Sequence, residues 1–264
     1  MRIFAVLIIL FFVSPARGDV LAQLRPGQSA VVIEVVDGDT VVLDHRVDGA
    51  RQVRLVGLQA PKLPLGRAGF KEWPLAADSR SALMVLTLNQ TVRLAFGGSP
   101  IDRHGRLLAH LFLKDGTWVQ GKMLSSGMAR VYTFADNRSL APEMYRLENS
   151  ARKSRVGIWS HPFYAVRAAT PERLEALTGT FQIVEGIVVD AVHVKARTYL
   201  NFSRDWRTDF TASINGKSLR LFKGSNFNPL SLKGKSVRIR GWIKNRNGPM
   251  IDLTHPEQIE VISE

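Results

Sequence analysis

The chain contains no cysteine, so neither a disulfide nor a thiolate metal site can stabilise it. Its six histidines include no pair with the spacing of a zinc site. Acidic residues are also few, because 23 Asp and Glu stand against 36 Lys and Arg and leave a formal net charge of +13. Such an excess of positive charge indicates a polyanionic partner: nucleic acid, an anionic membrane surface or an acidic polymer.

The apolar run Ile3–Val13 near the N-terminus is too short to span a bilayer comfortably. It follows a basic start at Arg2 and precedes the small residues Ala16 and Gly18, which is the pattern of a secretory signal peptide over residues 1–18. We therefore expect an exported protein, periplasmic or secreted, with no stable membrane insertion after signal cleavage. An uncleaved membrane anchor is the alternative.

The length of 264 residues, with 45% hydrophobic and 22% charged residues, suits a globular protein of two domains. Apolar periodicity predicts strands at 30–36, 40–43 and 52–58, a helix at 74–88, strands at 91–96 and 107–113, and helices at 119–126 and 141–155. This order predicts a small five-stranded barrel with packed helices, which we place at residues 19–165. The predicted fold class is therefore mainly β with helices (α+β).

Residues 166–179 contain a short helical pattern, which we interpret as a linker between the domains. Strands are then predicted at 180–189, 199–202, 210–214, 217–222, 236–242 and 250–253, with turns at Asn-Gly and Lys-Gly pairs between them. We expect residues 180–264 to form a second all-β barrel that resembles the OB type.

Two carboxylates and a hydroxyl gather in the turn Asp37-Gly38-Asp39-Thr40 between the first two predicted strands. Carboxylates at a tight turn suit a hard cation such as calcium or magnesium. Arg54 follows on the third predicted strand, and its guanidinium suits a phosphate. The turn alone is also compatible with a plain hairpin, because Asp-Gly is a common turn dipeptide.

Residues 29–160 resemble the thermonuclease, or staphylococcal-nuclease-like, family. The resemblance rests on the order and spacing of five pieces: DGDT at 37–40, RLVGL at 54–58, DRHGR at 102–106, MLSSGMARV at 123–131 and VGIW at 156–159. It covers about half of the chain. It implies a five-stranded OB-type barrel and calcium-dependent cleavage of DNA and RNA phosphodiesters.

The resemblance also implies roles for single residues. Asp39 matches a carboxylate metal ligand, and Asp37 matches the accompanying acid of the same turn, which is the weaker candidate. Arg54 and Arg106 match two catalytic arginines that bind the scissile phosphate, and planar guanidinium forks can hold such a group bidentately. The alternatives are a surface arginine on an edge strand for Arg54 and a hairpin arginine for Arg106.

Two positions depart from the family pattern after the third strand. Gln59 stands where the family has a metal-ligand Asp, and Lys62 stands where it has the Glu that acts as general base. Loss of a positioned general base typically costs about 10²- to 10⁴-fold in rate. We therefore expect the Lys62 ammonium to bind phosphate without metal, and a solvated lysine on a mobile loop is the alternative. Glu72 and Asp78 are the carboxylates nearest in sequence that could replace the missing ones.

The second predicted domain combines aromatic and basic residues. Aromatic side chains beside a basic face are typical of OB-type barrels that bind single-stranded nucleic acid. The alternative is that the aromatic side chains fill the barrel core. The candidate nucleic-acid contacts are Tyr199, Trp206, Arg238, Arg240, Lys244 and Arg246.

The sequence thus predicts a protein that binds nucleic acid and, if the altered site is active, hydrolyses its phosphodiester bonds. One alternative is a phosphate-binding module in which Arg54, Arg106 and Lys62 hold nucleic acid without cutting it. Another is a cell-envelope protein that interacts with anionic polymers. The preference for DNA or RNA and the oligomeric state stay open.

Overall fold

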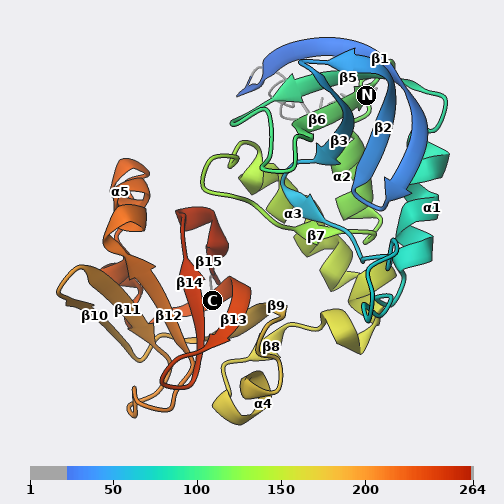
Figure 1. The fold of residues 1–264 in the computed structure, drawn as a ribbon. Helices are drawn as coiled ribbons and strands as arrows, with labels where there is room; N and C mark the ends of the chain where they lie inside the picture. Colours follow the sequence, from blue (N-terminus) through green and yellow to red (C-terminus); the bar gives the residue numbers. More distant parts are fainter. Residues whose placement is uncertain (1–22, 263–264) are drawn as a thin grey trace, which may run out of the picture.

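The computed structural model describes residues 23–262, and the predicted signal peptide at residues 1–18 lies outside them. The described chain forms two β domains, the first coloured blue to green and the second orange to red in Figure 1. No helix within residues 23–262 is long and apolar enough to cross a membrane.

A closed five-stranded barrel forms the first domain, as predicted. Its strands follow the order β1-β2-β3-β6-β5, and all neighbours are antiparallel except the parallel pair β3 and β6. Alternate apolar side chains point inward and are fully buried. The strands are β1 (Arg25–Asp37), β2 (Thr40–Val47), β3 (Ala50–Leu55), β5 (Thr91–Phe96) and β6 (Leu107–Leu113).

Three helices pack against this barrel, and all three were predicted from apolar periodicity within two residues of their ends. They are α1 (Ala76–Thr87), α2 (Val119–Ser125) and α3 (Ala141–Lys153). A short ladder of β4 (Leu58–Gln59) and β7 (Arg130–Val131) joins the loop after the third strand to the segment after α2. That ladder fixes the chain on both sides of the predicted site.

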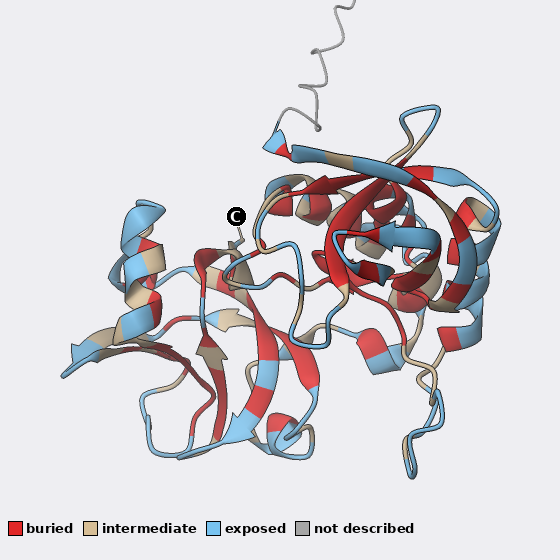
Figure 2. Cartoon of the chain, turned by 45° about the horizontal axis from the view of Figure 1, so that its top comes forward, coloured by how far each residue is buried: buried red, intermediate tan, exposed pale blue. Residues whose placement is uncertain are grey.

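Eight strands form one sheet in the second domain, in the order β10-β11-β12-β14-β13-β9-β8 with β15 paired to β13. This sheet is compatible with an OB-like domain. Figure 2 shows buried stretches along the strands of both domains. The strands are β8 (Arg167–Ala168), β9 (Phe181–Ile187), β10 (Asp190–Val194), β11 (Arg197–Asn201), β12 (Thr211–Asn215), β13 (Ser236–Asn245), β14 (Pro249–Leu253) and β15 (Ile259–Val261).

One predicted strand of this domain is wrong. Residues 217–222 belong to helix α5 (Gly216–Gly224), because the Asn215 side chain accepts a hydrogen bond from the Ser218 N–H at 2.9 Å and caps the helix. Ser218 and Phe222, four residues apart, then form the buried face. An Asn-Gly pair suits both a hairpin turn and this helix start, so local sequence did not distinguish them.

The predicted linker packs on the second domain. Strand β8 pairs with β9, and Leu174 of helix α4 (Pro171–Glu175) is buried in the second core. Short 3₁₀ helices complete the chain: η2 (Gly157–Ser160), η3 (Pro162–Tyr164), η4 (Pro229–Leu232) and η5 (Pro256–Gln258).

A buried ion pair joins the two domains. Arg240 on β13 is only 1% exposed, and its Nη2 lies 2.9 Å from Oε1 of Glu148, which α3 contributes and which is fully buried. The same guanidinium lies 2.5 Å from Glu260 on β15 and donates to the Val131 carbonyl at 3.1 Å. The prediction that Arg240 contacts nucleic acid is therefore wrong, because its charge is used inside the domain interface.

Further contacts surround this pair. His255 Nε2 lies 2.7 Å from Thr133 Oγ1, the Trp242 indole N–H donates to the Tyr132 hydroxyl at 3.0 Å, and Arg138 pairs with a carboxylate of the second domain. Aromatic rings also meet across the boundary, since the centroids of Tyr132 and Phe181 lie 4.9 Å apart. These contacts fix one domain against the other.

Removal of Arg240 should strongly destabilise the protein. An Arg240→Met variant leaves the Glu148 carboxylate buried without its main partner, and we expect a loss of about 3–5 kcal/mol in the free energy of unfolding. Lys244→Met on the same strand is the matched control, because Lys244 forms an exposed pair with Asp252 at 2.8 Å and should cost less than about 1 kcal/mol. Equal losses in urea denaturation would contradict the role of the buried pair.

Acid should also weaken the domain interface. Burial and, to a smaller extent, the nearby Arg138 charge lower the pKa of His255 from 6.5 to about 4 against an opposing effect of Asp136. The folded protein therefore binds this proton more weakly than the unfolded chain, so stability is full above pH 6.5 and falls towards pH 4, by roughly 3 kcal/mol from this residue. Thermal unfolding of His255→Gln should show a smaller loss over that range. Burial also lowers the pKa of His110, to about 3. His110 is present in both proteins, so its contribution to the acid loss cancels in the comparison.

Candidate functional site

The carboxylate turn lies inside the first domain at the junction of β1 and β2. Asp37 is 3% exposed and Asp39 is fully buried. Oδ2 of Asp39 accepts a hydrogen bond from the Ala60 N–H at 2.9 Å, and its Oδ1 accepts one from the Thr40 hydroxyl at 3.1 Å. Gly38 between them is required, because a Cβ there would lie 2.1 Å from a side-chain oxygen of α1. Packing thus holds both carboxylates in place.

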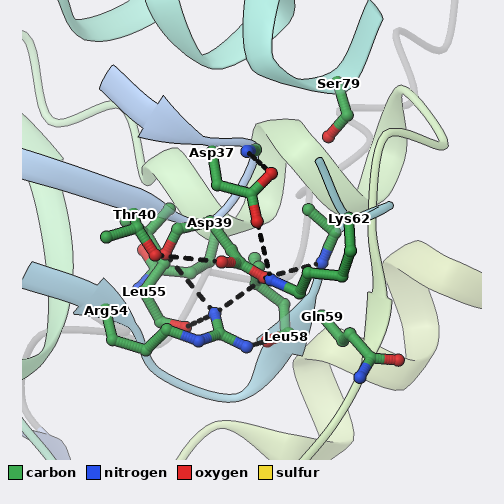
Figure 3. Close-up of polar contacts among 12 residues, drawn as sticks. Asp37, Asp39, Thr40, Arg54, Leu55, Leu58, Gln59, Lys62 and Ser79 are labelled. Carbon is green, nitrogen blue, oxygen red and sulfur yellow. Dashed lines mark hydrogen bonds and ion pairs between the residues drawn. The ribbon is translucent and has the colours of Figure 1, made fainter. Parts of the chain in front are cut away.

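The Lys62 ammonium lies between these two carboxylates, as Figure 3 shows. Its Nζ is 2.5 Å from Asp39 Oδ2 and 3.0 Å from Asp37 Oδ2. Arg54 approaches the same Asp39 oxygen from the other side, with its Nη1 at 3.0 Å. The alternative of a solvated loop lysine is therefore not the arrangement found, because the Lys62 side chain is 18% exposed and forms ion pairs with both carboxylates.

These two cations determine the charge of Asp39. Burial raises the pKa of its carboxyl, but Arg54, Lys62 and the hydrogen bonds from Lys62 and Ala60 lower it more, so that the pKa lies below its ordinary value. The carboxylate is therefore ionised at neutral pH. Its negative charge is balanced within the protein.

Gln59 points away from this cluster in Figure 3. It is 6% exposed, and its Oε1 accepts two hydrogen bonds from Arg130, from Nε at 3.0 Å and from Nη2 at 2.7 Å. Burial lowers the pKa of this arginine to about 10, so the guanidinium is still charged at neutral pH. The Gln59 amide therefore forms its hydrogen bonds with Arg130, its partner in the β4–β7 ladder, rather than with the carboxylate turn.

The donors around Asp39 do not fit a calcium ion. Calcium takes six to eight oxygen ligands, whereas this turn offers two carboxylates that already contact ammonium and guanidinium groups. Within residues 23–262 no group of three or more His, Asp or Glu side chains is placed to hold a metal. Glu72 and Asp78 are both exposed and do not line the cavity beside the turn, so they do not supply the missing ligands.

A cavity of about 780 Å³ opens beside the carboxylate turn. Its lining residues include Arg54, Lys62 and Arg106, for which the family resemblance implied one site, together with Arg67 and Arg103. Asp102 orients Arg106, with its Oδ2 2.8 Å from Nε and 2.7 Å from Nη2. Five cationic side chains thus line this cavity against the acids Asp37, Asp102 and Asp136. We call it the phosphate cavity, after the ligand that the sequence predicts for Arg54, Lys62 and Arg106.

Three aromatic residues on the rim of the phosphate cavity were missed by sequence reasoning. Tyr132 and Phe134 follow β7, and Trp242 comes from β13 of the second domain. Tyr132 and Phe134 alternate along the chain after MLSSGMARV, which is a signal that could have found them. Trp242 carried no such signal, because only the domain interface brings it there.

The basic residues predicted in the second domain do not form one face. Arg238 pairs with Glu185 at 2.7 Å and lies 3.7 Å from Glu260, next to the buried Arg240. By contrast, a separate cavity of about 520 Å³ gathers the candidates Tyr199, Trp206 and Arg246. Of the six predicted residues, Arg240 therefore lies at the domain interface, Arg238 and Lys244 pair with acids of their own domain, and three line one separate cavity.

A five-stranded barrel with two arginines beside a carboxylate turn defines a nuclease-like fold, and comparisons with known proteins agree. The family model described as staphylococcal nuclease homologue matches residues 52–161. A thermonuclease of Staphylococcus intermedius is 32% identical over 134 residues, which cover 50% of this chain and 77% of that protein. Protein ParB of Escherichia coli is 34% identical over 171 residues, 61% of this chain and 85% of that protein.

An uncharacterized endonuclease of Escherichia coli is similar as well, with 32% identity over 130 residues, which cover 49% of this chain and 75% of that protein. The chain belongs to the staphylococcal nuclease family.

Replacement of Lys62 should open the carboxylate turn to calcium. A Lys62→Gln variant removes the ammonium and leaves Asp37 and Asp39 with Arg54 alone, so we expect millimolar calcium to raise the melting temperature of the variant and not of the wild type. Without calcium the variant should melt lower than the wild type, because a buried carboxylate loses a partner.

The matched control is Lys71→Gln, which changes an exposed lysine of the same loop. It should show neither effect. A calcium response of the wild type equal to that of Lys62→Gln would mean that Lys62 does not block cation binding.

Proposed function

We propose that this protein binds nucleic acid through its phosphate backbone at the phosphate cavity, and that it does so without calcium. The observation that carries the proposal is the position of the Lys62 ammonium, 2.5 Å from Asp39 and 3.0 Å from Asp37. A covalently attached cation there takes the place in which the family resemblance implies a metal.

The surrounding charges support a phosphate ligand. Arg54 and Arg106 come from different strands or loops and both line the cavity with Lys62. Guanidinium groups bind phosphate oxygens through paired N–H donors, and an ammonium adds a point charge. Because Asp102 engages Arg106 through Nε and Nη2, the guanidinium is held in one orientation before a ligand arrives.

The same geometry argues against the family's calcium-dependent hydrolysis. An ammonium held between two carboxylates cannot accept a proton from water, so Lys62 cannot serve as general base. Gln59 is bound to Arg130 and cannot complete a metal site. The similar proteins named thermonuclease and endonuclease support nucleic acid as the ligand class, and we infer that this chain keeps the binding and has lost that reaction.

The binding test uses a labelled oligonucleotide in excess chelator. We expect binding that weakens steeply with salt, because phosphate contacts release counterions. Arg106→Ala should weaken binding by about 10- to 100-fold, as expected for loss of a charged hydrogen-bonding group. Arg93→Ala is the matched control, because Arg93 is exposed on β5 and does not line the cavity.

The activity test places the same proteins with single- and double-stranded DNA and with RNA, in calcium, magnesium, manganese or chelator. The proposal expects binding without cutting under each condition. Metal-dependent cutting that Arg106→Ala loses would overturn it and assign hydrolysis to the altered site.

A further inference from the structure

The phosphate cavity does not end at the domain boundary. Its rim residues Tyr132, Phe134 and Trp242 also line a second cavity of about 230 Å³. That cavity is also lined by Lys244 and Thr254 of the second domain. Because the two cavities share the three rim side chains at the domain boundary, we refer to them together as the boundary groove, with Arg54 and Arg106 on its first-domain side and β13 on its second-domain side.

Trp242 occupies the middle of the boundary groove. It is 43% exposed, which is unusual for the largest apolar side chain. Its indole N–H donates to the Tyr132 hydroxyl at 3.0 Å, and its ring meets Phe181 edge to face, with centroids 6.2 Å apart at 74°. An exposed indole fixed in this way offers a flat apolar surface that loses little entropy when a ligand covers it.

Charge along the boundary groove selects the ligand. Positive side chains outnumber acidic ones in the phosphate cavity at one end. At the other end Lys244, 61% exposed, lies beyond Trp242 and is paired with Asp252 at 2.8 Å. A ligand with anionic groups next to flat rings matches the cations of the phosphate cavity followed by the Trp242 ring. A nucleic-acid strand has this chemistry, with bases that stack on aromatic side chains and phosphates that follow basic ones.

We propose that the second domain extends the nucleic-acid site, so that a single strand with one phosphate in the phosphate cavity crosses the boundary and stacks a base on Trp242. This inference rests on the proposed function. The strand must be single, because a base inside a duplex stacks on its neighbours and offers no free face to a protein ring. Trp242 lies outside residues 52–161, so the family match does not account for it.

A second route over the same domain provides the contrast. Tyr199, Trp206 and Arg246 line the cavity of about 520 Å³, which shares no lining residue with the boundary groove. Trp206 is 50% exposed and carries Arg207 over its ring at 4.6 Å. A loss of affinity on replacement of Trp242 therefore indicates the boundary groove, and a loss on replacement of Trp206 indicates the separate cavity.

The test measures affinity against ligand length in chelator, with a thymidine bisphosphate and with thymidine or uridine strands of three and six nucleotides. The wild type should gain affinity from the bisphosphate to the longer strands. Trp242→Leu should lose about 5- to 150-fold in affinity for the strands and little for the bisphosphate, because stacking on one base is removed. Trp206→Leu should bind every ligand as the wild type does.

A fluorescence measurement separates contact from folding. Trp242→Phe keeps an aromatic ring but removes the indole, so strands should still bind by anisotropy, while the tryptophan quenching expected of the wild type should be smaller in the variant. The fluorescence comparison does not depend on whether Trp242→Leu is stably folded.

The outcomes distinguish the two proposals. If bisphosphate and strands bind and Arg106→Ala weakens both, but Trp242→Leu changes nothing or Trp206→Leu causes the loss, the boundary route is wrong and the proposed function stands. If neither bisphosphate nor strands bind the wild type, both fail.

Discussion

A buried carboxylate with no access to water requires a positive partner, and in this fold that carboxylate is Asp39. It lies fully inside the first domain, where the junction of β1 and β2 meets the chain after β4. An unpaired charge at such a position would cost several kcal/mol. Lys62 and Arg54 provide the compensation together, so the turn is held without an ion from solution. The barrel, the turn and the phosphate cavity all depend on this cluster.

The two departures from the family pattern have related consequences. Lys62 adds a positive charge beside Asp39, and Gln59 removes a negative one nearby and instead accepts from Arg130. Arg130 then lies over the Phe181 ring of the second domain at 4.5 Å. The position at which the family resemblance implies a metal-ligand Asp is thereby connected to the domain interface through Arg130.

Much of the first domain and its site followed from local sequence. Apolar periodicity located β1 to β3 and the three helices, and the family resemblance implied one site for Arg54 and Arg106, which line the same cavity. The second domain was harder to predict. Arg238 and Arg240 do share a face of β13, but sequence could not tell that Arg240 contacts Glu148 of α3 and that Arg238 pairs with Glu185 of β9. The partners of such side chains are determined by packing between residues far apart in the chain, which cannot be inferred from a single sequence.

A covalently held cation differs from a metal ion in how it can be regulated. Calcium leaves its site when its concentration falls, whereas the Lys62 ammonium is always at the end of its own side chain. Phosphate binding at this cavity would then respond to ionic strength and not to calcium. Since Arg240, Trp242 and His255 hold the second domain at the edge of the same cavity, the surface that the proposed ligand would contact is preformed across both domains.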